Sequence, residues 1–262
     1  MARIYPICSS SKGNCIFIGT QGHGVLIDVG CSFRALKNAL SLIGTDLSGI
    51  EAVFITHEHI DHIAGLAMLI KNTKIPVFAS KGTEYSLRES EKIPENAVIY
   101  NAKDGYQSAA FEVSCFATSH DAAESVGYKV KFRDQLIGFC TDTGFVTDEA
   151  KQALMGCNAV YLESNHDVDM LRKNPNYHAE LKRRILSDKG HLSNDACAEF
   201  AKVLVANGTR HLVLGHLSQE NNSPATAENC TKRALAAAGF HAERDYTLNI
   251  APVNTDGAFI AV

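Results

Sequence analysis

Hydrophobic residues recur along this chain at two spacings, which predict short strands mixed with amphipathic helices. Short apolar runs separated by turn residues are typical of strands. The predicted strands span Ile4–Cys8, Cys15–Gly19, Val25–Val29, Ala52–Ile55, Val77–Ala79, Phe111–Ala117, Val126–Phe132, Leu136–Cys140, Val160–Glu163 and Leu212–Leu214. The predicted helices span Phe33–Ile43, Leu66–Ile70, Leu181–Leu186, Ala196–Ala206 and Ala225–Ala238, and Gly44 is a natural residue to follow the first of them.

This mixture predicts an α/β protein whose stacked sheets are covered by helices. The pattern alone does not separate an αββα sandwich from other α/β layouts. A length of 262 residues fits one large domain or two small ones, and we find no low-complexity linker and no long repeat.

Composition adds mainly exclusions. A hydrophobic fraction of 45% is ordinary for a globular protein, and no stretch approaches the roughly 18 apolar residues that span a bilayer. The first eight residues lack the apolar run of a signal peptide, so we expect a cytoplasmic protein. The eight cysteines form no C-x-x-C pair, which favours reduced, mostly buried thiols over disulfides or a zinc ribbon. The net charge of −4 gives no global signal for nucleic acid and does not exclude it.

The most informative segment directly follows the predicted strand Ala52–Ile55. It places four potential metal ligands within six residues, namely His57, His59, Asp61 and His62. A loop that leaves a strand can turn all four side chains toward one point, and a mixed imidazole and carboxylate set suits zinc, manganese or iron. A helix starting near Asp61 would also favour bound anions. The alternative is a chance polar loop, but the full spacing is far more specific than an isolated H-x-H.

This H-x-H-x-D-H spacing resembles the signature of the metallo-β-lactamase superfamily. Four further residues stand where the superfamily's other motifs are expected, in the expected order: Asp28, His120, Asp142 and His216. The resemblance therefore covers essentially the whole chain. It implies an αββα four-layer sandwich, a single domain over residues 1–262 without a β-CASP insertion, and a dinuclear metal site at one edge of the two sheets.

The resemblance also implies a ligand set for two divalent metal ions, which could be zinc, manganese or iron. The first ion would be held by His57, His59 and His120, the second by Asp61, His62 and His216, with Asp142 bridging both. Asp28 is expected to support the cluster through hydrogen bonds and not to touch metal. His120 could instead be a turn residue, and His166, His191 and His211 are rivals for the last ligand position.

Paired cations of this kind acidify a bound water, so hydrolysis needs no serine or cysteine nucleophile. Three features favour a phosphodiester substrate. An aspartate at position 142 is typical of the phosphodiesterase and thioesterase branches. The serine-rich turn with Ser11, Lys12 and Asn14 could cradle a phosphate. Residues 165–191 contain six basic and four acidic residues, a local charge of +2 that a solvated helix face explains equally well.

A finer resemblance, to the YycJ/WalJ family, is carried by residues 9–14, 163–167 and 190–194, which read SSSKGN, ESNHD and GHLSN. That family implies a 5′-to-3′ exonuclease acting chiefly on DNA. This chain has Ser10 where many relatives have glycine, which leaves the details of phosphate binding open.

Within this interpretation we expect Asp61 and His191 to act in catalysis, with His191 protonating the departing alkoxide. His191 could instead help to cap the helix near Asn194. The predicted substrate-binding residues are Ser11, Lys12, Asn14, Asn165, His166 and Ser193, although His166 could simply pack under its loop. The alternatives to a nuclease are a small-molecule hydrolase, such as a cyclic phosphodiesterase or a glyoxalase II-like thioesterase, and a non-catalytic scaffold.

Overall fold

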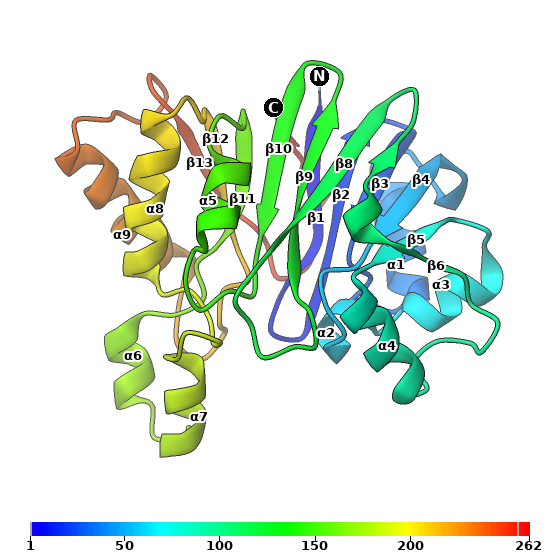
Figure 1. The fold of residues 1–262 in the computed structure, drawn as a ribbon. Helices are drawn as coiled ribbons and strands as arrows, with labels where there is room; N and C mark the ends of the chain where they lie inside the picture. Colours follow the sequence, from blue (N-terminus) through cyan, green and yellow to red (C-terminus); the bar gives the residue numbers. More distant parts are fainter. Residues whose placement is uncertain (1, 256) are drawn as a thin grey trace. The chain divides into compact units, whose positions relative to one another are not determined.

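The computed structural model describes residues 2–255 and 257–262 (Figure 1). Its internal contacts divide the chain into two compact units. Unit 1 comprises Met1–Ser108, Ala122–Val126 and Pro252–Val262, and unit 2 comprises Ala109–Asp121 and Gly127–Ala251. The single domain expected over residues 1–262 stays a prediction. Among the described residues, no helix has the length and apolarity needed to cross a bilayer.

Unit 1 is built on a mixed sheet with the strand order β14-β1-β2-β3-β4-β5-β6. The pairs β14–β1, β1–β2 and β2–β3 are antiparallel, and the pairs β3–β4, β4–β5 and β5–β6 are parallel. The strands are β1 (Arg3–Ser10), β2 (Gly13–Thr20), β3 (His23–Ile27), β4 (Ile50–Phe54), β5 (Val77–Ala79), β6 (Ile99–Asn101) and β14 (Ile260–Ala261). The short strand β7 (Tyr106–Gln107) comes just before Ser108, where the first stretch of unit 1 ends.

The helices of unit 1 bury an apolar stripe on this sheet. The helices of unit 1 are α1 (Phe33–Leu42), η1 (Leu47–Gly49), α2 (Ile60–Ile63), α3 (Leu66–Asn72), α4 (Lys81–Glu89) and η2 (Ala102–Asp104). Leu36 and Leu40 of α1 and Leu66 of α3 are fully buried in the same core cluster as Phe17 and Leu26 of the sheet. Each such side chain contributes about 1.5–3 kcal/mol of hydrophobic free energy.

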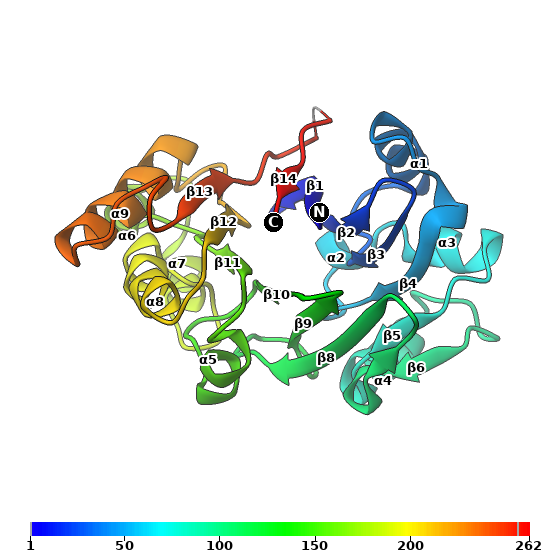
Figure 2. The same ribbon diagram turned by 90° about the horizontal axis from the view of Figure 1, so that it is seen from above.

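Unit 2 has its own mixed sheet, with the order β13-β12-β11-β10-β9-β8. Strands β10 to β13 run parallel, and β9 is antiparallel to β10. The strands are β8 (Phe111–Ala117), β9 (Val126–Phe132), β10 (Gln135–Cys140), β11 (Ala159–Glu163), β12 (His211–Gly215) and β13 (Thr247–Ile250). The helices are α5 (Asp148–Leu154), α6 (Val168–Lys173), α7 (Ala179–Ile185), α8 (Asn194–Ala206) and α9 (Pro224–Ala237). Figures 1 and 2 both show α8 and α9 packed side by side.

Two mixed sheets with helices confirm the α/β class. The predicted strands and helices are present, with ends shifted by a few residues; α1 ends at Leu42, one residue before its predicted end. Elements that the pattern missed bury little: α4 buries only Thr83 and Leu87, and no residue of β6 is fully buried. A weakly buried element leaves a weak periodic signal.

Candidate functional site

The four predicted ligands that follow β4 lie together in unit 1. The ring centroids of His57 and His62 are 4.2 Å apart, and those of His57 and His59 are 4.5 Å apart. His57 and His62 are buried, and His59 and Asp61 are partly exposed. The short helix α2 starts directly after His59, and its turn carries His62 back toward His57. Three imidazoles and one carboxylate are therefore gathered at the end of one buried strand.

Asp28 holds this cluster from beneath. Its Oδ2 accepts a hydrogen bond from His62 Nδ1 at 2.7 Å, and its Oδ1 accepts one from the Thr56 amide at 2.8 Å. Burial raises the pKa of the Asp28 carboxyl, while His62 and Thr56 oppose that shift. With Nδ1 protonated and bound to Asp28, His62 presents Nε2 as a lone-pair donor. Asp28 thus contacts His62 directly, and its supporting role in metal binding stays a prediction.

Asn14, predicted to bind substrate, is buried beside the cluster. Its Nδ2 lies 3.1 Å from His62 Nε2 and 3.4 Å from Asp61 Oδ2, and it also donates to the Ser10 carbonyl. The neighbouring turn residues Ser11 and Lys12 are exposed. Asn14 is thus placed to orient two of the predicted ligands, while the other two turn residues remain accessible.

In unit 2 the predicted ligands His120, Asp142 and His216 lie near one another. Asp142 Oδ1 is 3.7 Å from His120 Nε2 and 3.6 Å from His216 Nε2. His120 Nδ1 lies 3.0 Å from the Gly190 carbonyl, a contact that requires a proton on Nδ1 and turns Nε2 toward Asp142. Burial lowers the pKa of His120, and Asp142 opposes the shift. A neutral imidazole is the form that binds metal.

Three predicted site residues have a left-handed backbone conformation, which residues other than glycine rarely adopt. Asp28, Asp142 and His216 have φ angles of +60°, +55° and +56°. Each follows a strand: Asp28 after β3, Asp142 two residues after β10, and His216 directly after β12. Left-handed φ at residues other than glycine costs of order 1 kcal/mol and concentrates at functional sites. In this structure the left-handed conformation turns the chain at the end of each strand, so that these three side chains leave the line of the strand.

Glu163, at the end of β11, is a functional residue that the sequence reasoning did not assign. It is fully buried, and its Oε1 accepts hydrogen bonds from His191 Nδ1 at 2.8 Å and from His216 Nδ1 at 2.9 Å. Its Oε2 accepts the amide protons of Thr143 and Leu192. Burial alone would raise the pKa of Glu163, but His191 and His216 outweigh it and lower the pKa overall. The available signal was an acidic residue that ends a fully buried strand.

His191 has the contacts of a site residue and not those of a helix cap. Its Nδ1 is hydrogen-bonded to Glu163 Oε1 and lies 3.6 Å from Asp142 Oδ1. The His191 side chain is 20% exposed. The N-cap of α8 is Ser193, whose hydroxyl accepts the Ala196 amide. The alternative prediction, in which His191 helps to cap this helix, is therefore not what the structure shows.

Of the predicted substrate-binding residues of unit 2, Asn165 and His166 are buried and Ser193 is partly exposed. Asn165 donates to the His216 carbonyl at 2.9 Å, and the Ser193 hydroxyl is occupied as the α8 cap. His166 is 1% exposed, and neither of its ring nitrogens has a hydrogen-bond partner among the described residues. Burial lowers the pKa of His166 to about 4, so it is neutral near pH 7. His211, a rival for the last ligand position, contacts Thr247 instead.

The basic helix α7 contacts residues next to the predicted ligands of unit 2. None of its residues is buried, and Arg184 forms an ion pair with Asp121, the residue after His120. At its end the Ile185 carbonyl accepts the His191 amide proton. Arg183 is exposed, as are Arg172 and Lys173 at the end of α6. Positive side chains thus face solvent on α6 and on α7, and α7 also contacts His191 and Asp121.

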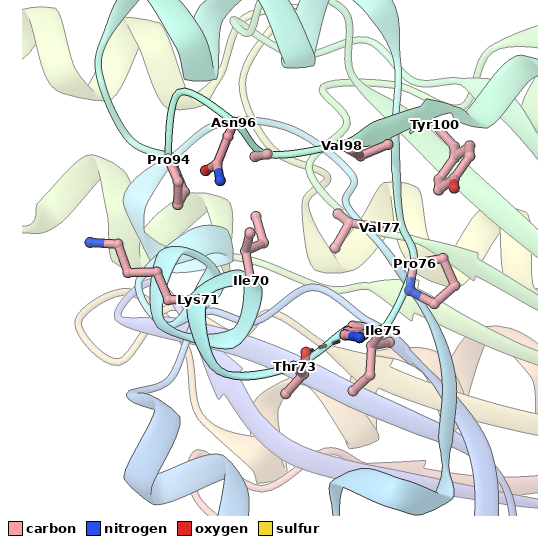
Figure 3. A pocket seen from close by; sticks show the side chains of 12 residues that line it. Ile70, Lys71, Thr73, Ile75, Pro76, Val77, Pro94, Asn96, Val98 and Tyr100 are labelled. Carbon is pink, nitrogen blue, oxygen red and sulfur yellow. Dashed lines mark hydrogen bonds between the residues drawn. The ribbon is translucent and has the colours of Figure 1, made fainter.

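A surface pocket of about 440 Å³ in unit 1 is separate from these residues (Figure 3). It is lined by apolar side chains, among them Ile70, Ile75 and Tyr100, together with Lys71 and Lys74. None of the predicted site residues lines it. The pocket has no acid, base or metal-ligand cluster and carries no catalytic prediction.

The donors in each unit fit a divalent metal ion by their chemistry. In unit 2, one donor atom each from Asp142, Glu163, His191 and His216 lies within 4.8 Å of the others. Metal ions bind imidazole and carboxylate atoms at about 2.0–2.2 Å, so donors around one ion lie about 3–4 Å apart. Mixed nitrogen and oxygen donors suit zinc, manganese or iron. Because Glu163 already accepts four hydrogen bonds, it is better suited to orient the histidines than to bind metal.

We expect Glu163→Gln to weaken the hydrogen bonds that orient His191 and His216. The glutamine side chain has one NH₂ group in place of an acceptor oxygen, so the backbone amides of Thr143 and Leu192 or the two histidines lose an acceptor. The free energy of unfolding should fall by about 1–3 kcal/mol, measured by urea denaturation. Glu112→Gln is the matched control, since Glu112 forms only an exposed ion pair with Lys131. Equal stability losses in the two variants would contradict the role assigned to Glu163.

Comparison with known proteins places the chain in a family. The model of the beta-lactamase superfamily domain matches residues 23–217. The chain is 35% identical to exodeoxyribonuclease YycJ of Bacillus anthracis over 236 residues, covering 89% of each protein. It is 32% identical to exodeoxyribonuclease WalJ of Streptococcus pneumoniae, covering 92% of this chain and 90% of WalJ.

Solved structures agree on the fold. The metallo-beta-lactamase fold protein YhfI of Bacillus subtilis superposes with a TM-score of 0.69 at 14% identity, covering 97% of this chain and 98% of YhfI. The fold and the family expected from the sequence are thereby confirmed. The chain belongs to the beta-lactamase superfamily, among the relatives of YycJ and WalJ, and is a metal-dependent hydrolase of the metallo-β-lactamase fold.

Proposed function

We propose that this protein hydrolyses phosphodiesters as a 5′-to-3′ exonuclease on DNA. The observation that carries the proposal is that the donors of each unit are already oriented by a buried carboxylate, Asp28 on His62 and Glu163 on His191 and His216. A site prepared in this way needs little reorganisation to bind metal. The names of YycJ and WalJ, both exodeoxyribonucleases, support DNA as the substrate.

The proposed cofactor is a pair of divalent metal ions. His57, His59 and His120 would hold one ion and Asp61, His62 and His216 the other, with Asp142 shared between them. When bound, such ions supply positive charge for the phosphate and an acidified water as nucleophile. The protein's contribution is to hold these imidazole and carboxylate donors in place.

His191 is the proposed proton donor to the departing alkoxide. His191 donates a hydrogen bond from Nδ1–H to Glu163. Its Nε2 is therefore available to hold and release a second proton. Partial exposure of the His191 side chain leaves it accessible to a substrate. We propose that Asp61, also partly exposed, acts in catalysis as well as in metal binding.

Substrate contacts are proposed on both units. In unit 1, Ser11 and Lys12 are exposed for phosphate, with Asn14 behind them. In unit 2, Asn165 and His166 are buried and would support the site from its interior side, whereas Ser193 is partly exposed. The exposed basic residues of α6 and α7 would bind the sugar-phosphate backbone, which suits a polymer better than a small molecule.

We expect His59→Ala and Asp142→Ala to reduce nuclease turnover to background, because each removes a donor to the proposed metal pair. The assay follows release of label from 5′-labelled and 3′-labelled DNA duplexes in the presence of manganese. His211→Ala is the control, since that histidine contacts Thr247 and lies outside the donor set. Hydrolysis of a thioester without digestion of any DNA or RNA would refute the nuclease proposal.

We expect the triple variant Arg172→Ala, Lys173→Ala and Arg183→Ala to bind DNA more weakly and with a flatter salt dependence. Each lost phosphate contact lowers the slope of log affinity against log salt concentration by about 0.9 for duplex DNA. The control removes the same charge elsewhere, through Lys71→Ala, Lys74→Ala and Lys92→Ala in unit 1. If both triple variants show the same slope, the α6 and α7 charges only face solvent.

A further inference from the structure

Three cysteines that the proposed mechanism does not use come together in unit 1. Cys8 on β1 and Cys15 on β2 are directly opposite each other in the antiparallel pair. Cys31 follows Gly30, whose amide donates to the Asn14 carbonyl at 2.7 Å, so Cys31 lies next to Cys15 across that bond. Cys8 and Cys15 belong to the unit 1 core, and Cys31 packs against it while remaining partly exposed.

The three thiols differ in their readiness to ionise. The Cys31 sulfur interacts with the thiols of both Cys8 and Cys15, which lowers its pKa. The same interactions, with burial, raise the pKa values of Cys8 and Cys15. The thiolate is the reactive form of cysteine, and a partly exposed thiolate is the one that oxidants reach. Cys31 therefore differs from the buried cysteines of this chain in both respects.

Its slight exposure favours Cys8 over the fully buried Cys15 as the partner of Cys31. A Cβ placed on Gly13 would lie 3.5 Å from Cys8 Sγ and 2.9 Å from the Gly30 carbonyl oxygen. Gly13 thus contacts both Cys8 and Gly30, the residue that precedes Cys31. The Cys8 and Cys31 thiols interact with each other. A disulfide between them requires Cα atoms about 4.4–6.8 Å apart. Cys15 is fully buried, while Cys8 retains slight exposure.

We propose that Cys31 is an oxidation site that reacts with hydroperoxides and is resolved as a disulfide with Cys8. In the first step the Cys31 sulfur attacks a peroxide oxygen, the O–O bond breaks, and Cys31 becomes a sulfenic acid as water leaves. In the second step the Cys8 sulfur forms the S–S bond, the S–O bond breaks, and a second water leaves. Two thiols lose two electrons in total, and hydrogen peroxide accepts both.

Oxidation at this position has a route to the predicted metal ligands of unit 1, and this part of the inference rests on the proposed function. Gly30 is packed so closely that a Cβ there would lie 1.7 Å from the Asp61 carbonyl oxygen and 2.5 Å from the Asn14 amide nitrogen. Because Gly30 precedes Cys31, we expect a backbone shift that accompanies disulfide formation to press on Asp61 and Asn14. Since Asn14 also contacts His62, we expect divalent metal affinity to fall by about tenfold.

The oxidation is tested on the full chain with its metals. The protein is treated with hydrogen peroxide, blocked with iodoacetamide and digested without reduction for mass spectrometry. We expect a Cys8–Cys31 peptide that dithiothreitol removes. Cys8→Ser should leave a Cys31 sulfenic acid that dimedone traps, and Cys115→Ser, a partly exposed cysteine of unit 2, should still form the bond. A reduced Cys31, or a bond to Cys15, would overturn the proposal.

A second measurement separates this proposal from the proposed function. Manganese and zinc affinities are compared before and after oxidation by competition with a coloured chelator. A tenfold weakening in wild type that is absent in Cys31→Ser supports the coupling. An oxidised protein with unchanged metal affinity would refute the coupling alone. Failure of the disulfide to form would leave the nuclease assay unaffected, so the two ideas fail independently.

Discussion

The structure depends on two buried carboxylates that hold imidazoles in place. Asp28 in unit 1 binds His62, and Glu163 in unit 2 binds both His191 and His216. A buried carboxylate without partners would cost several kcal/mol, and these two are tolerated because every oxygen accepts hydrogen bonds. In each case the carboxylate accepts a hydrogen bond from Nδ1–H, so Nε2 of the imidazole remains available to a metal ion or a substrate. Each unit therefore orients its histidines through a buried carboxylate.

The strand ends explain how these side chains reach their positions. Asp28, Asp142 and His216 leave their strands through left-handed backbone conformations that are unfavourable for their residue types. The buried strands β3, β10 and β12 fix the position of each turn, and the hydrogen bonds beyond it offset the strain. The apolar cores of the two units therefore serve the proposed chemistry by holding the starting points of polar loops.

Much of this arrangement was predictable from the sequence, for a physical reason. The ligand cluster after β4 is local, so spacing along the chain identifies it, and the alternation of strands and helices identifies the α/β class. Glu163 was missed because its partners lie 28 and 53 residues away, and only the fold brings them together. The position of Asn14 beside His62 and the meeting of Cys31 with Cys8 and Cys15 depend on strand register in the same way.

The central proposal is that the oriented histidines and aspartates of this chain bind a pair of divalent metal ions. Elemental analysis of purified protein, after loading with zinc or manganese and removal of free metal, tests it most directly. We predict two ions for each chain in the wild type and a clear loss in both His57→Ala and His216→Ala. A wild type that retains no metal, or variants that retain the wild-type amount, would contradict this claim.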